Sequence, residues 1–145
     1  MTDPVHKDFL PAVFGLVRGI RKRFNARAAA MEMTYARAQA LLHISACEGL
    51  SQAELAERLE IRTPSMNRTL DHLEAAELIE RRSDPDDKRL RRLFLTPQAH
   101  AKAERIVGFT EELRREVYHD VTPEELAQAL ETLRRIQQNL DRMEG

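Results

Sequence analysis

The sequence has few cysteine, glycine and aromatic residues. Among its 145 residues it has one Cys, five Gly and no Trp, and only 5% are aromatic. Because Cys47 has no second cysteine to pair with, an intrachain disulfide and a thiolate cluster for structural zinc are both excluded. The core must come mainly from aliphatic side chains, which favours helices over a β-sandwich or barrel.

The sequence also lacks an excess of charge of either sign. Its 23 basic residues nearly cancel its 24 acidic ones, for a net charge of -1. Binding to a polyanion through bulk charge is therefore excluded, and any nucleic-acid surface must be local. No apolar run approaches the roughly 20 residues that cross a bilayer, and a secretory signal pattern is missing at the start. We expect a cytoplasmic protein with no membrane partner.

Amphipathic segments with recognisable start signals fill most of the sequence. Apolar residues spaced three and four apart predict a helix over roughly residues 6–31. Ser51 and Glu54 form a capping box, and threonine or Thr-Pro start signals precede four other helices. These later helices begin near residues 34, 51, 63, 97 and 123. Two segments, 79–82 and 90–95, flank a charged, turn-rich run and predict a β-hairpin.

The two short helices before the hairpin have features that suit double-stranded DNA. A helix fits the major groove, and a basic arm reaches the neighbouring minor groove. The second short helix carries polar side chains near its start, and six basic residues lie between residues 81 and 92 of the hairpin against three acidic ones. We therefore predict a mainly α fold with a small β-hairpin wing, a winged helix-turn-helix. The alternative interpretation is a generic helix pair whose polar residues only face solvent.

Three sequence motifs carry a resemblance to a known family. Asp84-Pro-Asp-Asp-Lys-Arg89, followed by Leu95-Thr96, resembles the wing signature of the MarR family of bacterial transcription regulators. Leu55-Ala-Glu-Arg-Leu59 and Arg68-Thr-Leu-Asp-His-Leu-Glu74 resemble its helix-turn-helix. The resemblance covers almost the whole chain. It implies one domain over residues 1–145, with a DNA-binding lobe at about 34–96 and dimerisation helices at about 6–31 and 97–144.

The resemblance also implies roles for individual residues. Arg89 would enter the minor groove, where narrow A-T-rich segments carry enhanced negative potential, and Asp87 would hold the wing through an ion pair with it. The other positions expected to contact DNA are Arg62, Thr63, Ser65, Asn67 and Arg68. Many relatives have glycine where this chain has Glu60, Glu77 and Ala99, so we expect altered or strained turns there.

A homodimer is expected from the last helix as well as from the resemblance. Apolar residues recur along it at close to heptad spacing, and one small chain has little left to cover such a stripe. The stripe consists of Leu126, Leu130, Leu133, Ile136, Leu140 and Met143. A second copy is its simplest partner.

These features together predict a transcriptional repressor that binds an inverted-repeat operator and is released by a small aromatic or anionic effector. The candidate ligand-binding residues are Arg18, Tyr35, Arg37 and His43. Alternatives within the family are redox regulation through Cys47 and metal regulation, although the five histidines lack paired ligand spacing.

Another class of function is a winged-helix module that binds protein instead of DNA. DNA binding predicts an affinity that falls steeply with salt, and a protein module does not. Because the sequence has no phosphate-binding loop, nucleophile elbow or metal motif, we expect no enzymatic activity and no cofactor.

Overall fold

The computed structural model describes residues 3–59 and 63–143, with Thr63 described by its backbone only. The chain divides into two compact units, Met1–Thr110 and Glu111–Gly145. Helix α5 (Pro97–Val117) continues from the first unit into the second. Within the described ranges, every helix is too short or too polar to cross a lipid bilayer.

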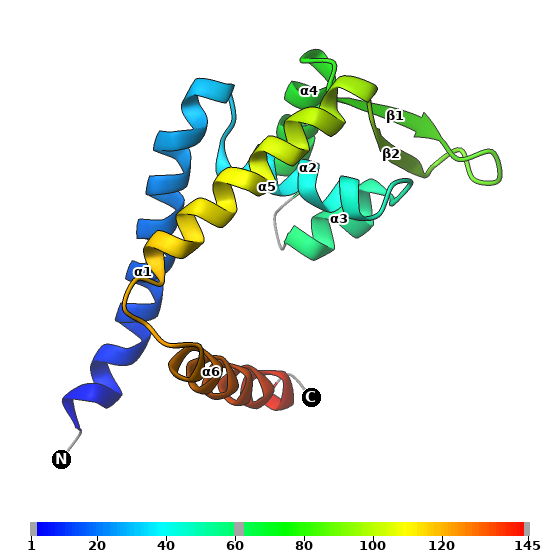
Figure 1. The fold of residues 1–145 in the computed structure, drawn as a ribbon. Helices are drawn as coiled ribbons and strands as arrows, with labels where there is room; N and C mark the ends of the chain where they lie inside the picture. Colours follow the sequence, from blue (N-terminus) through cyan, green and yellow to red (C-terminus); the bar gives the residue numbers. More distant parts are fainter. Residues whose placement is uncertain (1–2, 60–62, 144–145) are drawn as a thin grey trace. The chain divides into compact units, whose positions relative to one another are not determined.

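The first unit contains helices and one β-hairpin, as the sequence predicted (Figure 1). Its elements before α5 are α1 (Pro4–Ala28), the 3-10 helix η1 (Ala29–Met31), α2 (Tyr35–Ala46), α3 (Gln52–Leu59), α4 (Thr63–Ala75), β1 (Ile79–Ser83) and β2 (Arg91–Leu95). The second unit contains the end of α5 and α6 (Pro123–Met143). The predicted fold class is confirmed.

Most of the predicted start signals form hydrogen bonds. Thr34 Oγ1 accepts from the Arg37 N–H at 3.2 Å, and Ser51 Oγ accepts from the Glu54 N–H at 3.1 Å. In the second unit, Thr122 and Glu125 exchange both capping-box hydrogen bonds, each at 3.1 Å. Because a side-chain oxygen satisfies an otherwise unpaired amide, each such residue marks where a helix begins. Helix α4 begins at Thr63, the threonine of the predicted Thr-Pro start signal.

The core of the first unit is aliphatic and surrounds α2, which packs against α1, α3, α4 and β2. The largest fully buried side chains are Phe24, Leu41, Ile44, Leu55, Met66, Leu70, Leu73, Ile79, Leu93 and Ile106. Phe24 extends this core with aromatic contacts to Tyr35 at 5.3 Å and Phe109 at 4.9 Å between ring centroids. These contacts join α1, α2 and the part of α5 that lies in the first unit.

The hairpin is joined to the helical core by the turn between α2 and α3. Strands β1 and β2 are antiparallel, with Ile79 opposite Leu95 and Ser83 opposite Arg91. The Gly49 N–H donates to Leu93 O at 2.8 Å, and the Leu93 N–H donates to Leu50 O at 2.9 Å. The chain just before α3 therefore extends the sheet along β2, a pairing that the sequence analysis did not predict.

The described positions at which many relatives have glycine differ in backbone conformation. Glu77 has φ of 59°, in the left-handed region, whereas Ala99 is fully buried inside α5 and is not among the described residues with positive φ. Glu60 lies outside the described residues. The Glu77 carbonyl accepts hydrogen bonds from Thr96 Oγ1 and Gln98 Nε2, both at 2.7 Å. The expected backbone strain is therefore found at Glu77.

We expect Glu77→Gly to raise the free energy of unfolding by about 1 kcal/mol, because glycine adopts this φ without the Cβ clash. Thermal or urea unfolding of the two proteins measures the change. Glu104→Gly, the same substitution on a regular turn of α5, is the control and should lower stability by about 1 kcal/mol. Equal destabilisation by both substitutions would show that Glu77 is not strained.

Candidate nucleic-acid interface

Helix α4 has one buried face and one polar face. Met66, Leu70 and Leu73 are at most 1% exposed and fix its orientation. Asn67 and Arg68 are exposed on the other side, and Ser65 is half-buried. The helix is therefore held by its apolar side while hydrogen-bonding groups near its start remain accessible. Arg62 lies outside the described residues, as does the side chain of Thr63.

The polar face of α4 is connected to α3 by a hydrogen bond. Gln52 Nε2, at the start of α3, donates to Asn67 Oδ1 at 3.3 Å. Arg68 Nη2 donates to Ser65 Oγ, also at 3.3 Å. Gln52 is not recognisable as part of this face from the sequence, since its contact with Asn67 depends on how α3 and α4 pack. The amide of Asn67 is thereby oriented, with one of its acceptor positions occupied.

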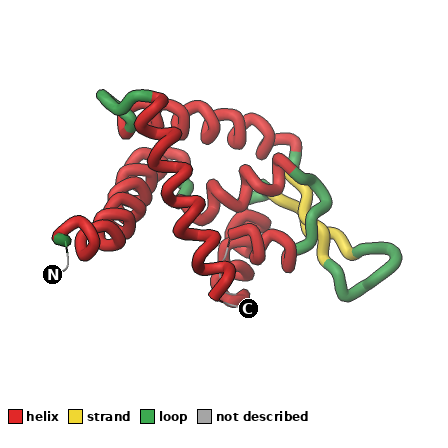
Figure 2. The backbone as a smooth tube through the Cα atoms, turned by 90° about the horizontal axis from the view of Figure 1, so that it is seen from below, coloured by secondary structure: helices red, strands yellow, loops and turns green. Residues whose placement is uncertain are grey.

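The wing loop, residues 84–90, projects beyond the ends of both strands (Figures 1 and 2). The side chain of Arg89 is 96% exposed, and its Nε lies 3.7 Å from Asp87 Oδ1. The same carboxylate oxygen accepts from the Arg89 backbone N–H at 3.0 Å. Asp87 therefore holds the backbone of the tip more closely than it holds the guanidinium, which remains accessible.

The six basic residues of the hairpin stretch fall into two groups. Arg81 is paired with Asp71 and Glu74 of α4, and Arg92 is paired with Asp84. Arg82 pairs with Glu80 at 2.7 Å and lies over the ring of Phe94. The remaining three, Lys88, Arg89 and Arg91, are exposed. The available positive charge is therefore concentrated at and next to the tip, and Arg81 ties the base of the wing to α4.

The Asp84–Arg92 pair has perturbed ionisation. The hydrogen bond from Arg92, together with that from the Asp86 backbone N–H, lowers the pKa of Asp84 below its ordinary value. The carboxylate raises the pKa of Arg92 in turn. Because the pKa of Asp84 is lowered in the folded state, the pair contributes its stability at neutral pH and loses it as the pH falls through that lowered pKa.

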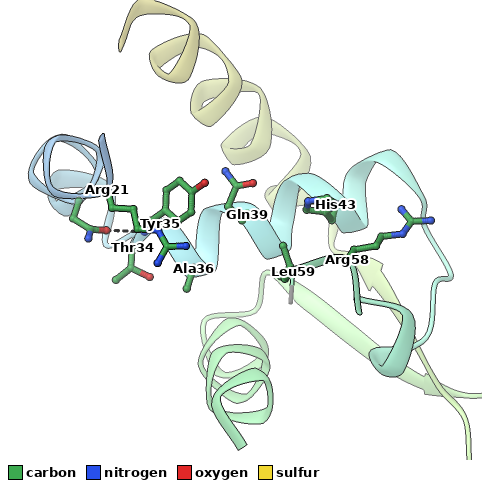
Figure 3. A pocket seen from close by; sticks show the side chains of 9 residues that line it. Arg21, Thr34, Tyr35, Ala36, Gln39, His43, Arg58 and Leu59 are labelled. Atoms are coloured by element: carbon green, nitrogen blue, oxygen red, sulfur yellow. Dashed lines mark hydrogen bonds between the residues drawn. The ribbon is translucent and has the colours of Figure 1, made fainter. Parts of the chain in front are cut away.

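A cavity of about 420 Å³ lies between α1, α2 and the end of α3 (Figure 3). It is lined by Arg21, Asn25, Thr34, Tyr35, Ala36, Gln39, His43, Arg58 and Leu59. Two of the four predicted ligand-binding residues, Tyr35 and His43, line it, whereas Arg18 and Arg37 are not among the lining residues. The two arginines that do line the cavity, Arg21 and Arg58, were not among the predicted residues.

The two arginines lie at opposite ends of the cavity. Arg21 lies beside Tyr35, with its guanidinium 5.1 Å from the ring centroid, and Arg58 lies on the side of His43 (Figure 3). No acidic side chain lines the cavity among the described residues. The lining therefore combines positive charge, amide groups and one aromatic ring.

The structure also describes the residues on which the redox and metal alternatives depend. Cys47 is half-buried and caps the C-terminus of α2. The described part of the chain has no group of three or more His, Cys, Asp or Glu side chains placed to hold a metal ion.

The helix pair, the wing and the surrounding helices define a winged helix-turn-helix protein. Residues 32–90 match the model of the MarR family. One solved transcriptional regulator is 27% identical, has a TM-score of 0.83 and covers 92% of this chain and 98% of its own. The match to the MarR family thus covers the segment from just before α2 to the end of the wing loop.

Two other solved structures share the fold. The transcriptional regulator SlyA has a TM-score of 0.85 at 19% identity, over 93% of this chain and 95% of its own. A mutant of MarR from E. coli, complexed with operator DNA, has a TM-score of 0.83 at 21% identity, over 93% of this chain and 99% of its own.

Proposed function

We propose that the protein is a transcriptional repressor that binds an inverted-repeat DNA operator as a homodimer and is released by a small effector. The observation that carries the proposal is the exposed guanidinium of Arg89 on a wing whose base is tied to α4 through Arg81. The match of residues 32–90 to the MarR family, and the operator complex of the E. coli protein with the same fold, support it.

Helix α4 supplies the contacts in the major groove. Its start directs backbone N–H groups toward phosphate, while Ser65, Asn67 and Arg68 offer hydrogen bonds to base edges or phosphates. Arg89 enters the adjacent minor groove, where its charge is attracted most strongly by narrow A-T-rich segments. Arg62 and Thr63 belong to the same proposed surface by their sequence positions.

Exposed apolar side chains support dimerisation. In α6, Leu130, Leu133, Leu140 and Met143 are between 42% and 79% exposed. Helix α1 separately exposes Val5, Leu10, Phe14, Leu16 and Val17. Large apolar patches on a soluble chain mark interaction sites. A two-fold dimer covers these residues and presents two copies of α4 to successive major grooves.

The effector is proposed to be a small anion with a flat apolar body. Arg21 and Arg58 supply charge, and Tyr35 supplies a ring for stacking. Because the cavity is built partly from α3, an occupant contacts the DNA-binding lobe directly. For release, the occupant must favour a dimer geometry that fits DNA poorly, and bound DNA then weakens effector binding by the same factor.

Selection from random duplex DNA should yield an inverted repeat with half-site centres about 10 bp apart, the separation of two recognition helices in successive major grooves. Affinity for the selected duplex should fall steeply with salt, and Arg89→Ala should weaken it by about tenfold or more. Fluorescence anisotropy measures both effects. Salt-independent binding, or no selected duplex, would favour a protein-binding module instead.

Replacing two apolar residues of α6 should separate the subunits. We expect Leu133→Glu with Leu140→Glu to convert the dimer to a monomer in light scattering, because paired copies would bury these charges. Gln128→Glu with Gln138→Glu adds the same charge on the other side of α6 and should leave a dimer. A dimer that survives the leucine substitutions would place the interface elsewhere.

An anionic effector should act through Arg21. In a panel of aromatic carboxylates tested for release of the selected duplex, we expect Arg21→Ala to lower effector affinity by about tenfold or more while DNA affinity stays within about twofold, as for loss of one charge-assisted hydrogen bond. Arg23→Ala is the control, since Arg23 is exposed on the same helix and is not among the residues lining the cavity. Equal effects of the two substitutions would argue against the cavity as the site.

A further inference from the structure

We propose that Arg92 and Asp84 are positioning residues for DNA recognition, which clamp the wing loop to the turn between α2 and α3 and so orient Arg89. The inference rests on the proposed DNA-binding function. It concerns two residues that are separate from the Asp87–Arg89 pair at the tip.

The clamp is built around one guanidinium with two partners. Arg92 Nε donates to Asp84 Oδ2 at 2.6 Å, and Arg92 Nη1 donates to the Gly49 carbonyl at 2.9 Å. Asp84 begins the wing loop, whereas Gly49 lies in the turn that precedes α3. The arginine therefore connects the loop to the helix-turn-helix. A planar guanidinium suits this task because its donors have fixed relative directions.

From Asp84, hydrogen bonds continue to the tip of the wing. Its Oδ1 accepts from the Asp86 N–H at 2.8 Å, and its own N–H donates to Leu90 O at 3.0 Å. The Leu90 N–H donates to Asp87 O at 3.0 Å, and Asp87 in turn holds the Arg89 N–H. An unbroken chain of contacts thus runs from Gly49 to Arg89.

Burial separates the clamp from the DNA-contacting tip. The side chain of Asp84 is 10% exposed and that of Arg92 is 37% exposed, against 96% for Arg89. The Arg92 guanidinium donates hydrogen bonds to Asp84 and to the Gly49 carbonyl. It therefore acts by holding the wing loop in place, and not as a free cation that contacts DNA. The lowered pKa of Asp84 agrees with a pair that is ionised at neutral pH.

A fixed loop lowers the cost of seating Arg89 in a narrow groove. Ordering a long side chain or a loop on binding costs free energy, and a loop already held in place avoids part of that cost. Strands β1 and β2 are held independently by their own pairing and by Arg81. Loss of the clamp should therefore loosen the tip and leave the hairpin and the dimer in place.

The main test uses the full chain, the selected duplex and a second duplex in which the A·T pairs at the wing contacts are replaced by G·C. We expect Asp84→Asn with Arg92→Gln, which keeps the net charge, to bind about three- to tenfold more weakly, the range expected for ordering one long side chain. We also expect it to reduce the preference for A·T. Arg105→Gln removes an exposed charge of α5, outside the wing, and should keep that preference.

Arg92→Lys tests geometry separately from charge. Lysine keeps the positive charge but lacks the planar guanidinium that donates to both Asp84 and the Gly49 carbonyl. We expect it to reduce the A·T preference as well. A double-mutant cycle with Arg89→Ala gives the decisive comparison: once Arg89 is absent, the clamp substitutions should cost no further affinity. If the loss of DNA affinity from the clamp substitutions adds fully to the loss from Arg89→Ala, the proposal would be overturned. An unchanged A·T preference in the clamp variants would overturn it as well.

A measurement without DNA separates this proposal from the function on which it rests. A nitroxide label on Lys88→Cys, in a Cys47→Ser background, reports motion of the tip by electron paramagnetic resonance. We expect faster label motion in Arg92→Lys than in the parent, with a melting temperature close to the parent's. Unchanged motion would overturn the clamp. Salt-independent binding by the wild-type protein, or unchanged affinity in Arg89→Ala, would count against the proposed function and not against the clamp.

Discussion

The packing around α2 is the constraint on which the first unit depends. Ala38, Ala40, Leu41 and Ile44 are fully buried on this one short helix, which packs against α1, α3, α4 and β2. Two of these four residues are alanine, so neighbouring elements can approach the helix closely. Because protein interiors are close-packed, a larger side chain at either position would have to displace another element.

This packing connects the proposed effector site with the DNA-binding lobe. Tyr35, Gln39 and His43 follow one another at intervals of four residues along α2, so they share a face of the helix, and that face lines the cavity. The buried residues of the same helix contact the core that supports α4. In the proposed function, a ligand that shifts α2, or the end of α3 at Arg58, would change the support of α4. Such coupling would need no contact between ligand and DNA.

Local signals in the sequence were enough to predict most of the fold. Thr34, Ser51 and Thr122 each mark a helix start, because a capping oxygen acts within a few residues of the amide that it satisfies. The hairpin was equally predictable from its turn-rich loop. The cavity was predicted in part: Tyr35 and His43 line it, but whether Arg18 or Arg21 does so depends on how α1 is rotated against α2. Sequence spacing alone does not determine that rotation.

The contacts that the sequence could not predict join distant segments of the chain. Gln52 reaches Asn67, and Arg92 reaches both Asp84 and the Gly49 carbonyl 43 residues away. Such contacts depend on the packed arrangement of helices and strands, so neither propensity nor periodicity reveals them. They also explain how a nearly neutral chain can present a basic surface. Acidic partners within the protein hold Arg81 and Arg92, while Lys88, Arg89 and Arg91 stay exposed on the wing. In the proposed complex, this small number of charges would act at close range on one groove.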